Sequence, residues 1–225
     1  NLAKKGVIFV SINYRVGVFG FLALPELSKG SGGKGSGNFA FLDQVAALQW
    51  VKENIAAFGG DPDRVTIAGQ SAGSFSVNAL MSSPVAKGLF QCAIGESGAM
   101  FNADGRALTL EKAEENGTVF MKALKASSLA DMMAMSAADL QKAAGAFSSG
   151  PVIDGYVLTD NSYSVFTAAA QNDVPLLTGW NRDEGFSFGN DLSPEEYKAN
   201  AVKQYGNLSE EFLKAFPGNT ADEVK

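Results

Sequence analysis

The sequence predicts an α/β fold in which a mostly parallel central sheet is flanked by helices. Short, continuous apolar runs rich in Val and Ile, typical of strands buried on both faces, alternate along the chain with helical patterns. This alternation favours right-handed crossovers and therefore a parallel sheet. The 225 residues are 46% hydrophobic and 19% charged, which is the composition of a globular protein with a substantial core.

The elements of the first half follow from their patterns in order. An apolar, β-branched run predicts a strand over residues 7–12, and a glycine-rich loop follows over 29–37. Apolar residues at spacings of three and four predict a helix over 43–58, which Gly59 to Pro62 would end. A strand over 65–68, a helix over 72–81 and a strand over 92–95 complete the alternation.

The second half is expected to hold longer helical stretches. Residues 110–144 are helical in pattern, 151–155 resemble a turn, and 174–178 form another short buried strand. The tail over 193–225 predicts two polar helices, the first of them starting at Ser193 with Pro194 in its first turn. We expect one domain over residues 1–225, with a sheet that is incomplete at both ends.

A nucleophile motif lies between the strand over 65–68 and the helix over 72–81. Gly69-Gln70-Ser71-Ala72-Gly73 has the pattern G-x-S-x-G, in which a serine occupies a strained strand-to-helix turn. We expect Gly69 and Gly73 to be needed because the turn brings its backbone close to neighbouring elements. The helix that begins at Ala72 would direct free N–H groups towards a developing oxyanion. Ser71 is thus the candidate nucleophile.

A longer resemblance surrounds this motif. Residues 58–73, FGGDPDRVTIAGQSAG, resemble the active-serine signature of the type B carboxylesterase and cholinesterase family, which has the α/β-hydrolase fold. The similarity continues in family order through NYRVGVFGF (13–21), GN (37–38), DQ (43–44), AL (47–48), WV (50–51), GLF (88–90), SG (97–98), PVIDG (151–155) and GWNRDEG (179–185). It spans nearly the whole chain and is densest over 7–98.

The resemblance implies a carboxylic-ester hydrolase that works through an acyl-enzyme. It implies that Glu184 is the acid of the catalytic triad, and the residue's place after a buried strand and after the serine agrees with this role. Asp183 and Asp154 are the alternative acids. It also implies that the Ala72 N–H is an oxyanion donor, that Ser97 is a supporting hydroxyl near the acid, and that Phe147 shapes the acyl pocket.

The sequence departs from the family in three respects. It contains no histidine, so the general base would lie outside it, and the glycine-rich oxyanion segment expected before the first strand is missing as well. We therefore expect an internal fragment of a longer esterase that is inactive by itself. The family usually has Glu where this chain has Gln70, which weakens any case for a cationic choline substrate.

Several alternatives carry less weight. A non-catalytic, cholinesterase-like adhesion module is the rival function, although such proteins typically lose the serine, and hydrolysis of amides or thioesters stays open. The G-x-G-x-x-G pattern at 30–35 follows a Pro-containing loop and not a strand, so a flexible surface loop is the better interpretation. Cys92 lies in an apolar run, and we expect it to be a buried thiol.

The expected partner is a small-molecule ester. The net charge of −6 argues against nucleic acid, and the longest apolar stretches are far short of a transmembrane segment. No charged segment followed by a long apolar segment is visible, so the sequence predicts no signal peptide within these residues. No cofactor and no metal are required by the chemistry. Oligomeric state and cellular location stay open.

Overall fold

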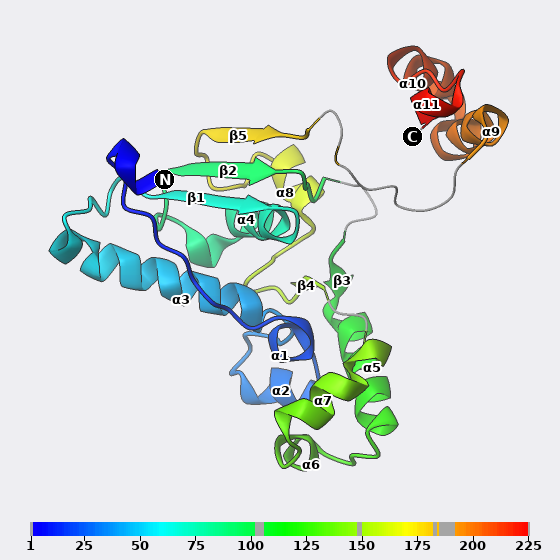
Figure 1. Cartoon of the computed structure of the whole chain (residues 1–225). Coiled ribbons are helices and arrows are strands. Elements are labelled where there is room, and N and C mark those ends of the chain that lie inside the picture. Colours follow the sequence, from blue (N-terminus) through cyan, green and yellow to red (C-terminus); the bar gives the residue numbers. More distant parts are fainter. Residues whose placement is uncertain (1, 102–105, 148–149, 182–183, 185–191, 225) are drawn as a thin grey trace. The chain divides into compact units, whose positions relative to one another are not determined.

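The computed structural model describes residues 2–101, 106–147, 150–181, 184 and 192–224 (Figure 1). The chain divides into two compact units, Asn1–Trp180 and Asn181–Lys225, which are described separately. The elements of the first unit are η1 (Leu2–Lys5), α1 (Gly17–Phe21), α2 (Pro25–Gly30), α3 (Phe39–Asn54), η2 (Ile55–Phe58), β1 (Thr66–Gln70), α4 (Ala72–Ser82), η3 (Pro84–Ala86), β2 (Cys92–Glu96), β3 (Leu108–Thr109), α5 (Leu110–Ala123), α6 (Leu129–Met133), α7 (Ala137–Ala143), η4 (Ala144–Ala146), β4 (Val152–Ile153), α8 (Ser162–Thr167) and β5 (Leu176–Gly179).

The central sheet of the first unit is parallel, as predicted. Its described strands have the order β1-β2-β5, with β2 in the middle. Gln70 at the end of β1 lies opposite Glu96 at the end of β2, and Glu96 lies opposite Gly179 at the end of β5. The carboxyl ends of all three strands therefore meet at one edge of the sheet (Figure 1).

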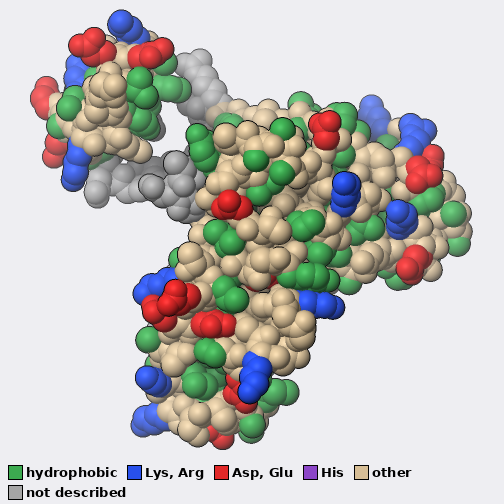
Figure 2. All heavy atoms as spheres, turned by 180° about the vertical axis from the view of Figure 1, so that it is seen from behind, with side chains coloured by type: hydrophobic (Ala, Val, Ile, Leu, Met, Phe, Trp, Pro, Cys, Tyr) green, Lys and Arg blue, Asp and Glu red, His purple; other side chains and the backbone are tan. Residues whose placement is uncertain are grey.

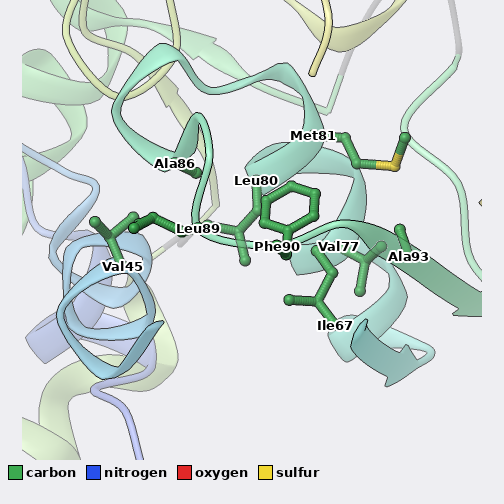
Figure 3. Packing of buried hydrophobic residues seen from close by; sticks show 9 residues of the cluster. All are labelled: Val45, Ile67, Val77, Leu80, Met81, Ala86, Leu89, Phe90 and Ala93. Atoms are coloured by element: carbon green, nitrogen blue, oxygen red, sulfur yellow. The ribbon is translucent and has the colours of Figure 1, made fainter. Parts of the chain in front are cut away.

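The main core packs two helices against this sheet. Ile67 of β1 and Ala93 of β2 are buried together with side chains from α4, α3 and the segment before β2 (Figure 3). The cluster consists of Val45, Ile67, Val77, Leu80, Met81, Ala86, Leu89, Phe90 and Ala93. Burying each large aliphatic side chain contributes about 1.5–3 kcal/mol. This packing holds α4 on one face of the sheet and so determines where its first residue lies.

The predicted strand over residues 7–12 is wrong for this structure. The segment forms no strand and is exposed, with Phe9 65% and Val7 51% accessible, and Figure 1 draws it as a plain trace. A strand needs a neighbour that supplies hydrogen-bonding partners, and none of the described strands pairs with this segment. The apolar pattern indicates that these side chains favour a buried position, but the described residues of the first unit do not cover them.

Other elements are confirmed with shifted bounds. The helix expected over 43–58 is α3 continued by η2, and the three other predicted strands appear as β1, β2 and β5. The helical stretch over 110–144 is interrupted because Ser128 and Ser136 each cap a new helix, their side chains accepting the N–H groups of Asp131 and Asp139. The expected turn over 151–155 contains β4, which pairs in parallel with β3.

In its described residues the second unit is helical, as expected, but it has three α-helices instead of the two predicted: α9 (Pro194–Tyr205), α10 (Ser209–Ala215) and α11 (Ala221–Val224), with η5 (Gly206–Leu208) between α9 and α10. The start at Ser193 is confirmed as a reciprocal cap. The Ser193 side chain accepts the Glu196 N–H at 3.2 Å, and the Glu196 carboxylate accepts the Ser193 N–H at 2.8 Å, which lowers the pKa of that carboxyl. None of the described helices has the length and apolarity to cross a membrane.

Acidic and basic side chains are interspersed over the surface. Figure 2 shows both signs distributed over one face of the first unit, without a continuous basic patch on that face. A nucleic-acid footprint needs clustered Lys and Arg. No such cluster is seen on the face of the first unit that Figure 2 shows.

Candidate active site

Ser71 occupies the turn between β1 and α4 in a strained conformation. Its φ of 53° and ψ of −115° lie in a region that residues with a side chain rarely adopt, at a cost of about 1–3 kcal/mol. Two hydrogen bonds hold it there: the Ser71 N–H donates to the Glu96 carbonyl at 2.9 Å, and the Phe75 N–H donates to the Ser71 carbonyl at 3.1 Å. The side chain is exposed at the carboxyl edge of the sheet.

Close backbone packing explains one glycine of the motif. A Cβ on Gly69 would lie 2.3 Å from the backbone of Gly73, so position 69 has no room for a side chain. A Cβ on Gly73 would meet nothing within 4 Å in the part of the chain that the structure describes. The expectation that Gly73 also needs to lack a side chain is therefore wrong for the described part of the chain. Gly73 contributes backbone atoms to the contact with Gly69, and a side chain on Gly73 would not enter that contact.

The neighbouring strand ends in a similar turn at Ser97. Ser97 has a φ of 52°, and its N–H donates to the Gly179 carbonyl at 2.8 Å, as the Ser71 N–H does to Glu96. The fully buried Ser74 donates from its Oγ to the Gly98 carbonyl at 2.6 Å, which joins the first turn of α4 to the residues after β2. Ser97 thus lies beside the Ser71 turn, and its supporting role stays a prediction.

Helix α4 begins directly after Ser71. It is eleven residues long, and no side chain caps its N-terminus. The first N–H groups of a helix lack partners within the helix and carry its positive end. The Ala72 N–H is the first of these groups, and its role as an oxyanion donor stays a prediction.

The three candidate acids differ in what the structure shows. Glu184 belongs to the second unit, where its Oε1 accepts the Asn181 N–H at 2.8 Å, and its pairing with Ser71 stays a prediction. Asp183 lies outside the described residues. Asp154 uses one oxygen, Oδ1, to accept three successive N–H groups from residues 156–158 at 2.8–3.0 Å. Asp154 therefore has a turn-forming role that accounts for its presence.

Strand geometry places Gln70, and a ring contact places Phe147. Alternation along β1 puts the exposed Gln70 on the face opposite α4, since the side-chain position of Gly69 points at Gly73. Phe147 packs on the buried Phe120, with ring centroids 5.2 Å apart, in a cluster that includes α5 and α6. The contact with Phe120 explains why Phe147 is partly buried. The role of Phe147 in an acyl pocket stays a prediction.

Two polar contacts, here called clamps, involve motif residues for which the sequence predicts no role: Arg15 with Asp43, and Asn38 with Val152. Arg15 donates to Asp43 from Nε at 2.8 Å and from its terminal nitrogen at 2.6 Å, which lowers the pKa of the Asp43 carboxyl. The buried Asn38 side chain donates to the Val152 carbonyl at 2.6 Å and accepts the Val152 N–H at 3.0 Å. Both clamps join segments far apart in the sequence, which a one-dimensional pattern does not reveal.

A cation near the Ser71 turn was also missed. The Arg106 guanidinium lies over the Phe75 ring, with Cζ 4.1 Å from the centroid. No motif marked this residue, because the contact depends on how the segment after β2 returns to α4. Elsewhere among the described residues, no group of three or more His, Cys, Asp or Glu side chains gathers as metal ligands would.

Several known proteins with similar sequences are named as esterases. The chain is 38% identical over 238 residues to fumonisin B1 esterase of Sphingopyxis macrogoltabida, an alignment that covers 99% of this chain and 42% of the relative. It is 42% identical over 201 residues to para-nitrobenzyl esterase of Bacillus subtilis, covering 83% and 39%. The chain thus spans less than half the length of these relatives.

Solved structures agree with this relationship. A PNB esterase structure superposes with a TM-score of 0.69 at 38% identity, over 94% of this chain and 47% of the other. A carboxylesterase of Geobacillus stearothermophilus gives a TM-score of 0.72 at 34% identity, over 95% and 48%. The model of the carboxylesterase family matches residues 1–220. With its parallel sheet and its strained serine between β1 and α4, the chain belongs to the carboxylesterase family and has the α/β-hydrolase fold.

Proposed function

We propose that the whole protein hydrolyses small-molecule carboxylic esters with Ser71 as the nucleophile. The observation that carries the proposal is the conformation of Ser71, whose positive φ exposes its side chain between the end of β1 and the first N–H groups of α4. Strain at such a position persists where function requires it. The named esterases among the relatives support the same chemistry.

The reaction proceeds in two halves. The Ser71 hydroxyl attacks the ester carbonyl carbon while a histidine base takes its proton, and the carbonyl oxygen becomes an oxyanion that accepts the Ala72 N–H. Collapse of the tetrahedral intermediate breaks the bond to the alcohol, which leaves with the proton returned by the histidine. Water activated by the same base then hydrolyses the acyl-enzyme and restores Ser71.

The histidine is contributed from outside these 225 residues, which contain none. Glu184 orients this base and stabilises its protonated form, as the acid of a triad does. The proposal requires no cofactor and no metal ion. The 225-residue chain by itself is therefore expected to be essentially inactive, because loss of one triad member costs nearly as much as loss of all three.

The adhesion-module alternative receives less support. Both Ser71 and Glu184 are present, whereas a non-catalytic binding module has no need to keep a strained serine. Relatives named as esterases match the chain over most of its length. Hydrolysis is the function that these features support best.

A fluorophosphonate probe tests the proposal. The whole protein should be labelled at residue 71, as identified by peptide mass, and should release a burst of 4-nitrophenol from 4-nitrophenyl butyrate. Ser71→Ala should abolish both signals, while Ser31→Ala in the glycine-rich loop, a matched loss of a hydroxyl, should retain both. Hydrolysis that survives in Ser71→Ala would overturn the proposal.

A further inference from the structure

A positive charge is stacked on Phe75, which lies one helical turn after the candidate nucleophile. Phe75 is the fourth residue of α4, and its N–H donates to the Ser71 carbonyl, so the two residues share one side of the helix. The Arg106 guanidinium stacks on the Phe75 ring at 4.1 Å from Cζ to the centroid. A cation–π contact of this kind holds an exposed arginine in a defined place.

The Phe75 ring also lies close to the strained turn. A Cβ built on Gly98 would be 2.7 Å from the Ser71 carbonyl oxygen and 3.0 Å from Cε1 of Phe75. One point in space is thus in contact with both the serine backbone and the edge of the ring. Arg106 is therefore stacked on a ring whose edge lies, like the Ser71 carbonyl oxygen, next to Gly98.

No carboxylate neutralises this cation in the described part of the chain. The ion pairs found there join Arg15 to Asp43 and Lys112 to Glu115, and neither includes Arg106. Glu96 is the acidic residue at the same edge of the sheet, but alternation along β2 directs it away from α4, because the side-chain position of Gly95 points at Ser74. Among the described residues, the Arg106 guanidinium is therefore a positive charge without an ion-pair partner.

We infer that Arg106 makes the enzyme favour esters that carry a carboxylate on the part of the molecule lying beside α4. This inference rests on the proposed function and names a substrate class for it. Arginine suits the role because its guanidinium stays charged and can donate two parallel hydrogen bonds to a carboxylate while its face rests on an aromatic ring. An exposed charge contact of this type changes selectivity by about fivefold.

The test compares two esters with the same leaving group. In mono-4-nitrophenyl adipate, a carboxylate replaces the terminal methyl group of 4-nitrophenyl hexanoate. The ratio of kcat/KM for adipate to that for hexanoate is measured in the whole protein and in Arg106→Gln, Arg106→Lys and Arg64→Gln. Arg64 lies before β1, at the opposite end of the strand from Ser71, and so controls for the loss of one positive charge.

Arg106→Gln should lower the adipate-to-hexanoate ratio about fivefold, mainly through KM, with hexanoate changed by less than about twofold. Arg106→Lys should retain part of the preference, Arg64→Gln should retain all of it, and 0.5 M NaCl should reduce it in the unmodified protein by screening.

An unchanged ratio in Arg106→Gln would overturn the inference. An equal loss for both esters would overturn it too, because Arg106 would then support Phe75 and the turn without selecting substrate. The proposed function fails separately, if Ser71→Ala still hydrolyses the hexanoate ester.

Discussion

The turns at Ser71 and Ser97 share a positive φ and the same kind of backbone hydrogen bond but have different surroundings. Their φ values are 53° and 52°, and each N–H donates to the carbonyl of the next strand, at 2.9 and 2.8 Å. Ser71 is exposed and is followed by an eleven-residue helix, whereas Ser97 is half-buried and is followed by irregular chain. A serine with a positive φ thus occurs at the ends of two strands, and the helix that follows Ser71 distinguishes the candidate nucleophile, because the first N–H groups of a helix lack partners within it and could donate to an oxyanion.

The largest expected effect removes each hydroxyl in turn. Ser71→Ala in the whole protein should lower kcat by about 10⁴-fold or more, because the covalent step is lost. Ser97→Ala should lower kcat by about tenfold at most, as expected for a supporting contact. Steady-state hydrolysis of 4-nitrophenyl butyrate measures both. Similar losses in the two variants would mean that the turns are functionally equivalent.

The second effect concerns the space around the Ser71 turn. Gly69→Ala should lower the free energy of unfolding by about 1–3 kcal/mol or more, since its Cβ meets the Gly73 backbone, which cannot rotate away as a side chain can. Gly73→Ala should be neutral or stabilising by up to about 1 kcal/mol, because it meets nothing within 4 Å and alanine favours the helix. Urea unfolding measures both, and equal destabilisation would contradict the difference.

The third effect tests the link between the two turns. Ser74→Ala should destabilise the protein by about 1–3 kcal/mol, because the buried Gly98 carbonyl loses its hydrogen bond. Ser82→Ala is the matched control: Ser82 is also buried in α4, but its Oγ donates to the Asn78 carbonyl four residues earlier in its own helix. We expect a smaller loss there. If urea unfolding shows that Ser74→Ala and Ser82→Ala lower the free energy of unfolding equally, the hydrogen bond from Ser74 to Gly98 has no special role.

The smallest effect lies away from both turns and depends on pH. The hydrogen bonds from Arg15 hold the pKa of Asp43 below the ordinary value of an aspartate, so the contribution of this pair is fully present above the unfolded-state pKa and is lost as the pH falls through the lower, folded-state pKa. The pair is partly exposed, so the contribution should be below about 1 kcal/mol.

Asp43→Asn should remove this part of the pH dependence, as measured by urea unfolding between pH 2 and pH 6. The stacked Arg106 and the two turns should be unaffected. An unchanged pH profile would show that the ion pair does not contribute to stability.

Two apolar segments differ in whether the strand that their hydrophobic pattern predicts is formed. The runs over 65–68 and 7–12 both predict buried strands, yet the first becomes part of β1 and the second stays exposed. The difference is the partner: β1 pairs with β2 along its length, and none of the described strands pairs with 7–12. Side-chain pattern is a property of the segment, whereas pairing is a property of its neighbours.

The sequence by itself determined the parallel α/β architecture, the strand-to-helix turn at Ser71 and the family, because hydrophobic periodicity and glycine-rich motifs are local. Tertiary structure decided what these elements touch. Among the described residues, it left no room for a side chain at Gly69 but left space for one at Gly73, it placed Asp154 where its carboxylate holds a turn, and it stacked Arg106 on Phe75. Each of these depends on segments that approach one another only after the chain has folded, and spacing along the chain carries no record of that approach.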